Sequence, residues 1–500
     1  MRLFAATTLS LAVAARSAAL TGVPQLSAAY DDILDARFDR VEAALKQACP
    51  PAPDEACAVL SSASLYWQIL LDPETRERDG RFNDVAAAAI GATEAWTKRE
   101  PRSAEAWFYL AGSYAPLIQF RVLRGERLAA ARDGRRTLDA LQRALQLDPG
   151  LADANFGIGL YHYYADVVPA AVKFLRFLLL LPGGDRAAGL REMRLARQEG
   201  VLLRGEADYQ LQQVYLWYEH QPDEALRLLR GLDARYSFNP IFLERIADAE
   251  DGYVHDPAAS AAAWQALAER ARDGGVYDAV RVEARARIGL AGQLDAMDET
   301  DRSIDALLPV VSASTGGVPP PLRAQALLSL ARAYDRVGRR DLAVKAYAAA
   351  RDHAPEGDAQ VRTQAGEGLR KVPDRTIAEA YRLALDGWRA YERGALDSAA
   401  SLLGRSVAIN ASDPIARYRY ARTLASRGEP ARAGELYESL LAGTPPPFIL
   451  GSVYLEYARL LERANDRARA IELYRRAAAA TSDAHAREEA STALKRLGGS

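Results

Sequence analysis

Apolar side chains recur along much of this chain at the three- and four-residue spacing of amphipathic helices. The clearest stretch is AQALLSLARAYDRVGRRDLAVKAYAAARDHAPEG, which begins at Ala324. Its apolar positions form two groups on either side of Gly338, and Pro355 follows the second group. Glycine permits a tight turn between helices, and proline ends a helix. The pattern therefore predicts two antiparallel helices, and no strand-like alternation stands out elsewhere, so the expected fold is all-α.

This helix pair is repeated. With Ala324 as position 1, small residues occupy positions 8 and 20, and large apolar residues occupy positions 4, 7, 11 and 24. The framework residues, up to position 32, are Leu327, Leu330, Ala331, Tyr334, Gly338, Ala343, Tyr347, Ala350 and Pro355. Further units in the same register begin at Ala380, Pro414 and Gly451, at intervals of 34 and 37 residues. Three prolines at positions 445–447 account for the longer interval.

The register resembles the tetratricopeptide repeat (TPR) of 34 residues, with Leu327 in place of the usual Trp and Ala331 in place of the usual first Gly. The resemblance implies an α-solenoid of stacked antiparallel helix hairpins, a TPR-like superhelix, because one hairpin cannot bury its apolar face alone. The segments DAQVRTQAGEGLRKV and DAHAREEASTALKRL follow two of the units. Each predicts a polar-faced helix that caps a stack.

The N-terminal half is helical but less regular. Trp107 and Pro149 are 42 residues apart where the repeat spacing requires 28, and residues 121–147 lack proline. We therefore expect a hairpin lengthened by about two turns in each arm. Further hairpins are expected at residues 206–236, 257–274 and 277–311.

These patterns predict four regions. Residues 1–19 are a signal peptide, and residues 20–240 form an irregular TPR-like helical domain with the lengthened hairpin. Residues 241–372 form hairpins that end in a regular TPR and a cap helix. Residues 373–500 form a C-terminal TPR domain with its own cap, after a break at residues 371–376.

The first residues, MRLFAATTLSLAVAARSAALTG, are typical of an export signal. Arg2 provides the positive end, an uncharged run of 13 residues follows, and Ser17 and Ala19 fit a small-residue cleavage pattern. The alternative is a buried first helix of a cytosolic protein. Export predicts a mature chain that begins near Leu20, in the periplasm or cell envelope of a bacterium.

The only two cysteines, Cys49 and Cys57, flank a proline-rich loop in CPPAPDEAC. Export makes a disulfide possible, and this bond would join two antiparallel helices at their turn. The alternative is a pair of free thiols packed as small apolar residues. Two cysteines without a nearby histidine cannot complete a zinc site.

The most apolar interior stretch is VVPAAVKFLRFLLLLPGGD, residues 167–185. Pro169 and Pro182 leave a helix of about 18 Å at residues 170–181, too short to span a bilayer. Because Lys173 and Arg176 share one face, this helix either is buried under its neighbours or lies in a membrane interface. The surrounding segment, GIGLYHYYADVVPAAVKFLRFLLLLPGGDRAAGLREM, resembles the inclusion-body-clearance family of outer-mitochondrial-membrane TPR proteins. That resemblance implies a scaffolding role or a role next to a membrane, and not an enzymatic mechanism.

Composition argues against several functions. A net charge of −2 favours neither nucleic acid nor an anionic membrane as the partner of the whole chain. The five histidines show no metal-binding spacing, the glycine-rich segment 314–321 lacks the Lys of a phosphate loop, and G-x-S-x-G is absent. His162 is expected to be a hydrogen-bonded core residue. The sequence thus predicts a protein that is not an enzyme and needs no cofactor or metal.

Binding remains as the expected function. The resemblance to TPR arrays implies a groove lined by first-helix positions such as 2, 5, 9, 12 and 13, and the candidate residues lie at positions 5, 9 and 13. The residues at these positions are Arg332, Arg336, Trp388, Tyr418, Arg422, Arg459 and Arg463. Arginine pairs well with carboxylates, so an acidic segment or a C-terminal carboxylate of a protein or peptide is the expected guest. The alternative is that these are ordinary solvated residues of an Arg-rich chain. The sequence therefore favours an exported TPR scaffold, with membrane-surface association through residues 170–181 or an enzyme with an unrecognised site as alternatives.

Overall fold

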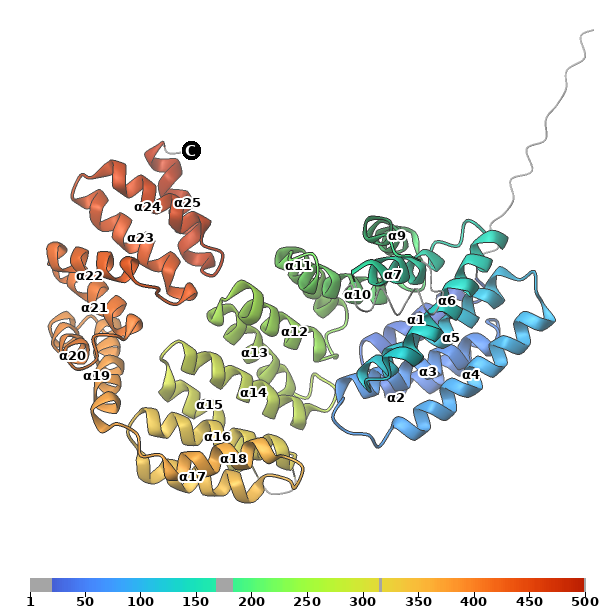
Figure 1. Cartoon of the computed structure of the whole chain (residues 1–500), viewed down its shortest axis with the longest axis horizontal. Coiled ribbons are helices and arrows are strands. Elements are labelled where there is room, and N and C mark those ends of the chain that lie inside the picture. Colours follow the sequence, from blue (N-terminus) through green and yellow to red (C-terminus); the bar gives the residue numbers. More distant parts are fainter. Residues whose placement is uncertain (1–19, 168–182, 314–316, 499–500) are drawn as a thin grey trace, which may run out of the picture. The chain divides into compact units, whose positions relative to one another are not determined.

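The computed structural model describes residues 20–167, 183–313 and 317–498 (Figure 1). Within these ranges there are twenty-four α-helices and one π-helical turn, and no residue lies in a strand. The prediction of an all-α array of helix hairpins is confirmed. The predicted signal peptide and the apolar helix at 170–181 lie outside the described residues.

The chain forms two compact units. In the described residues, the first comprises 20–167, 183–220 and 234–239, and the second comprises 221–233, 240–313 and 317–498. The second unit includes residues on both sides of position 372, where the sequence suggested a break between two stacks.

The first unit is built from pairs of adjacent helices. Its helices are α1 (Val23–Leu34), α2 (Phe38–Ala48), α3 (Asp54–Leu71), α4 (Asp79–Arg99), α5 (Ala104–Leu123), α6 (Arg127–Leu147), α7 (Ala154–Val167), α9 (Arg186–Glu199) and α10 (Arg204–Trp217). At 20 and 21 residues, α5 and α6 are the long hairpin expected between Trp107 and Pro149. Helix α10 carries Glu206, a fully enclosed carboxyl that accepts hydrogen bonds from Tyr30 and Gln210. Burial raises its pKa.

Helices α7 and α9 approach each other closely at two glycines. A Cβ atom at Gly159 would lie 2.7 Å from the carbonyl oxygen of Gly189, and a Cβ at Gly189 would lie 2.6 Å from the carbonyl oxygen of Gly159. One turn along α7, His162 Nδ1 lies 2.8 Å from Glu192 Oε2 on α9. The two helices therefore meet backbone to backbone, and a side-chain hydrogen bond adds to the contact.

Cys49 and Cys57 form a disulfide in the first unit, with Cα atoms 6.4 Å apart, inside the usual range for this bond. Cys49 follows the last residue of α2, and Cys57 lies in the first turn of α3. The bond thus joins the two helices at their turn.

Loss of this disulfide is expected to destabilise the first unit by about 2–3 kcal/mol, because it closes a loop of eight residues in the unfolded chain. Thermal unfolding of the oxidised chain, the chain with dithiothreitol, and the Cys49→Ser/Cys57→Ser variant measures the effect. The reduced and double-serine chains should unfold at the same lower temperature. A reductant that leaves the transition of the wild-type chain in place would contradict the expectation.

The second unit continues with shorter hairpins. Its helices are α11 (Pro222–Arg235, to residue 233), α12 (Ile241–Ala249), the π-turn η1 (Glu250–Val254), α13 (Pro257–Arg272), α14 (Ala279–Ala296), α15 (Thr300–Ser312), α16 (Pro320–Arg336), α17 (Arg340–His353), α18 (Ala359–Arg370), α19 (Arg375–Glu392), α20 (Leu396–Ile409), α21 (Pro414–Arg427), α22 (Pro430–Ala442), α23 (Pro447–Arg463), α24 (Arg467–Ala479) and α25 (Ala484–Leu497). Consecutive helices pack against each other from α12 to α18 and again from α19 to α25 (Figure 1).

Four of these hairpins match the repeat units in the sequence. They are α16–α17, α19–α20, α21–α22 and α23–α24. The turn residue at position 15 has positive φ in each of them, and it is glycine in three hairpins and Asn465 in the fourth. The small residues at position 20 are all fully buried alanines, because each lies where the two helices of a hairpin come closest.

Two expected hairpins are wrong. Residues 257–274 form the single helix α13, which pairs with α14 instead of folding back on itself. Residues 206–236 form two helices, but α10 belongs to the first unit and α11 mostly to the second. Helices α18 and α25, by contrast, pack on the hairpins α16–α17 and α23–α24 at the positions expected for caps.

Candidate functional site

The first helices of the four regular hairpins carry the expected groove residues at position 9. These residues are Arg332 on α16, Trp388 on α19, Arg422 on α21 and Arg459 on α23. Each of these helices contacts the next one in the series. The repeat therefore brings side chains that lie 34 to 56 residues apart in sequence onto neighbouring helices.

Trp388 and Tyr391 form an aromatic platform on α19. Their rings are almost parallel, at 9°, with centroids 4.8 Å apart. The guanidinium carbon of Arg422 lies 5.7 Å from the Trp388 ring and 5.6 Å from the Tyr391 ring. All three side chains are half-buried. A cation beside two aromatic faces is held in place by the negative charge of the rings.

Tyr391 is a residue that the sequence reasoning missed. It lies at position 12 of its unit, which can also face a TPR groove, and three residues after Trp388, so a helix places both rings on one face. That spacing was the available signal.

Acidic side chains alternate with the arginines along this surface. Arg422 lies 3.8 Å from Glu456, and Arg459 lies 3.1 Å from Glu456 and 2.7 Å from Glu489 on α25. Arg459 is therefore bound on both sides, whereas Arg422 has one loose ion pair. Of the two arginines, Arg422 is the more available to an incoming carboxylate.

The other expected residues have different environments. Tyr418 is only 8% exposed and packs in the core of the last hairpins, so little of its side chain can be reached from this surface. Burial raises the pKa of its hydroxyl. Arg463 is exposed and has no ion pair among the described residues, and Arg332 is exposed and donates a hydrogen bond to Gln364. No observation tests whether any of them binds a ligand, so that role stays a prediction.

Arg336 belongs to a buried polar cluster. It donates to Asp298 at 2.5 Å, lies 3.0 Å from Asp295, and stacks 4.3 Å from the ring of Tyr381 on α19. Its partner Asp298, in the turn between α14 and α15, is 2% exposed. Burial raises the pKa of Asp298 to about 6, although Arg336 acts in the opposite direction.

Two further contacts complete this cluster. Thr300 and Tyr381 share a hydrogen bond of 2.7 Å, and Arg419 of α21 donates to the carbonyl of Met297 at 3.1 Å. Arg419 also lies 5.2 Å from the Trp388 ring. Helices on both sides of residues 371–376 therefore contribute to one cluster. Arg419 connects this cluster to the aromatic platform through its contact with Trp388.

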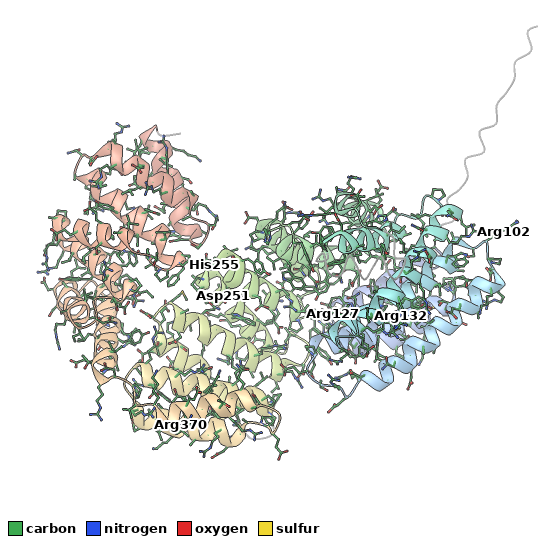
Figure 2. All side chains as sticks on the ribbon, viewed as in Figure 1. Arg102, Arg127, Arg132, Asp251, His255 and Arg370 are labelled. Carbon is green, nitrogen blue, oxygen red and sulfur yellow. A yellow bond between two sulfur atoms is a disulfide. The ribbon has the colours of Figure 1, made fainter. Side chains whose placement is uncertain are left out.

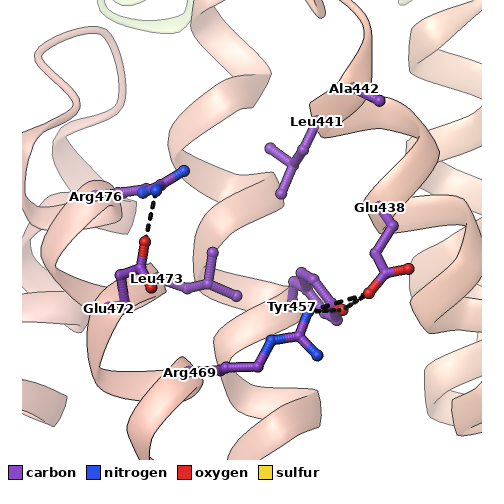
Figure 3. Close-up of a pocket in the computed structure, with 8 residues that line it drawn as sticks. All are labelled: Glu438, Leu441, Ala442, Tyr457, Arg469, Glu472, Leu473 and Arg476. Atoms are coloured by element: carbon purple, nitrogen blue, oxygen red, sulfur yellow. Dashed lines mark hydrogen bonds and ion pairs between the residues drawn. The ribbon is translucent and has the colours of Figure 1, made fainter.

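A pocket of about 360 Å³ lies between α22, α23 and α24 (Figure 3). It is lined by Glu438, Leu441, Ala442, Tyr457, Arg469, Glu472, Leu473 and Arg476. Glu438 accepts hydrogen bonds from Tyr457 and Arg469, which lower its pKa, and Arg476 pairs with Glu472. The charged side chains of the pocket are thus paired with each other, and none of them points to a particular ligand.

The described residues contain neither a metal-binding cluster nor a membrane-spanning helix. In the ranges 20–167, 183–313 and 317–498, no three His, Cys, Asp or Glu side chains are grouped so that they could hold a metal. Within the same ranges, every helix is too short or too polar to cross a bilayer.

Comparison with known proteins assigns the chain to no family. No protein-family model and no curated protein sequence matches the chain. Among solved structures, the P58(IPK) TPR domain is 14% identical, with 88% of this chain and 98% of that chain covered and a TM-score of 0.24. The human IFIT1 dimer with PPP-AAAA is also 14% identical, with 77% of this chain and 81% of that chain covered and a TM-score of 0.24. At such identities and TM-scores these likenesses imply no ligand or partner, and the TPR-like solenoid rests on the hairpins themselves.

Proposed function

We propose that this chain is an exported, non-enzymatic scaffold that binds a peptide or protein through the first helices α19, α21 and α23. The observation that carries the proposal is the position of Arg422 beside the stacked rings of Trp388 and Tyr391, with only a loose ion pair to Glu456. A guanidinium held in this way can exchange Glu456 for a carboxylate of a guest. The rings offer the guest an apolar surface beside that charge.

The expected guest is an extended segment with acidic side chains or a free C-terminal carboxylate. Arginine is suited to such a group, because its planar fork donates two parallel hydrogen bonds to a carboxylate. Export remains part of the proposal. Protein recovered from an envelope fraction should have an N-terminus near Leu20, and an N-terminus at Met1 would contradict export.

Arg422→Glu is expected to weaken peptide binding about tenfold or more, because it puts a carboxylate where the guest carboxylate should bind. The measurement uses an array of acidic peptides, each with a free or an amidated C-terminus, probed with the chain lacking residues 1–19. Binding should favour the peptides that carry more carboxylates.

Arg405→Glu is the matched control. Arg405 lies on the second helix α20 and is also 3.8 Å from a glutamate, Glu379, but it is not part of the Trp388–Tyr391 platform. This variant should bind as the unchanged chain does. Equal binding by the Arg422 and Arg405 variants would refute the assignment of the guest to this surface.

A further inference from the structure

The turn between α5 and α6 exposes apolar side chains in the first unit. Val122 and Leu123 end α5, Leu128 lies in the first turn of α6, and their exposed fractions are 57%, 36% and 60%. Scattered apolar residues are common on protein surfaces, but three within seven residues of one turn form a local patch. We call Val122, Leu123 and Leu128 the hairpin tip.

A buried arginine, Arg124, fixes the turn that carries the hairpin tip. Arg124 donates two hydrogen bonds to Asp79, at 2.7 and 2.8 Å, and others to the carbonyls of Pro73 and Thr75. Its side chain is only 8% exposed. The turn is therefore fixed to the segment between α3 and α4, so its apolar side chains do not depend on a loose loop for their exposure.

The charge around the hairpin tip is strongly positive. Residues 121–136 include six arginines but only two acidic residues, Glu126 and Asp133. Asp133 pairs with Arg121 and Arg136. Arg127 and Arg132 are exposed and have no ion pair among the described residues (Figure 2).

The two unpaired arginines lie next to the apolar residues. Arg132 follows Leu128 by four residues, which puts both on one face of α6, and Arg127 immediately precedes Leu128. The nearest carboxylate, Glu126, is the N-cap residue of α6 and lies 3.7 Å from Arg121. A surface that is both apolar and cationic points to an anionic partner.

We propose that the hairpin tip docks onto an anionic phospholipid surface, with Val122, Leu123 and Leu128 entering the interface while Arg127 and Arg132 bind lipid phosphates. Three side chains are too few for the core of a stable protein interface, which buries about 800 Å² per partner. They suit a bilayer, where short apolar groups enter between headgroups and arginines bind the phosphates. The tip lies in the first unit and the peptide surface in the second, so neither proposal depends on the other.

Flotation of the whole chain without residues 1–19 with lipid vesicles tests this proposal. Vesicles of phosphatidylcholine with phosphatidylglycerol should carry the protein upward, vesicles of phosphatidylcholine alone should not, and added salt should weaken the association. Val122→Asp/Leu128→Asp and Arg127→Glu/Arg132→Glu should each reduce binding about tenfold or more. All four side chains are exposed, so both variants should keep the helical circular dichroism of the unchanged chain.

Matched control variants change residues outside the tip. Arg102→Glu replaces another exposed arginine of the first unit without an ion pair among the described residues, and Val280→Asp replaces an apolar side chain that is 52% exposed on α14 (Figure 2 labels Arg102). Both should float as the unchanged chain does. The proposal is overturned if the wild-type chain ignores anionic vesicles, or if the tip variants still float, which would place lipid binding elsewhere, such as residues 170–181. Tip variants that abolish self-association but not flotation would instead show a contact between copies of the chain.

Discussion

Replacing Gly189 with leucine is expected to destabilise the contact between α7 and α9 by about 3 kcal/mol or more. A Cβ atom at this position would lie 2.6 Å from the carbonyl oxygen of Gly159 and 2.7 Å from the backbone nitrogen of Tyr163. Both obstacles are backbone atoms of α7, so no rotamer change relieves the overlap. The helices must separate, and the hydrogen bond between His162 and Glu192 is lost with the contact.

Hydrogen exchange measures this effect locally. Amide protection in α7 and α9 should fall about a hundredfold, since 1.4 kcal/mol corresponds to a factor of ten. Gly134→Ala in α6 is the control, because a Cβ there meets nothing within 4 Å and alanine favours the helix. Gly134→Ala should leave protection unchanged or raise it slightly. If Gly189→Leu behaved in the same way, the backbone contact would be wrong.

Replacing Arg336 with alanine is expected to destabilise the second unit by about 3 kcal/mol near neutral pH. The change leaves Asp298, which is 2% exposed, without its nearest cation, and the removal of one partner from a buried pair is costly. The expected value is at the lower end for such pairs, because the guanidinium is itself 36% exposed. Urea unfolding provides the measurement.

The same variant has a predictable pH dependence. Burial already raises the pKa of Asp298 to about 6 in the folded chain, above the value of about 3.9 expected when unfolded. Its ionisation therefore costs stability as pH rises from about 4 to 6, and without Arg336 the folded pKa rises further. The loss of stability in Arg336→Ala should be largest near pH 8 and should shrink toward pH 4, where the Asp298 carboxyl is protonated in the folded state of both chains.

Arg332→Ala provides the control for this experiment. Arg332 lies one turn earlier on α16, is exposed, and donates only to Gln364 in the described contacts. Its loss should change stability by less than about 0.5 kcal/mol at any of these pH values. Equal effects of the two alanine variants would mean that the cluster around Asp298 contributes nothing specific.

The helix pairs could be predicted from sequence because the repeat encodes them locally. Turn residues such as Gly338 and closely packed residues such as Ala343 lie a fixed number of positions apart within one hairpin. The steric rules that select glycine and alanine there need no knowledge of distant contacts. The single helix α13 was misjudged because apolar periodicity alone does not say which neighbouring helix it pairs with.

The surroundings of the candidate site could not be predicted in the same way. Position 13 of a repeat can face solvent, but the side chain of Arg336 donates a hydrogen bond to Asp298. Asp298 lies 38 residues upstream, in an irregular turn. Arg459 likewise meets Glu489, which lies in the cap helix rather than in a repeat. Pairings of this kind depend on tertiary neighbours, and a repeat register carries no information about them.

Helix α18 has a consequence for the order in which the chain can fold on the ribosome. It packs on α16 and α17 through Val361 and Ala365, and half of its other residues are exposed to water. A nascent chain that has emerged as far as Arg370 can thus close the apolar end of its newest hairpin before α19 is synthesised. Ribosome-bound intermediates of that length should resist protease, while the later hairpins are added one after another onto a finished base.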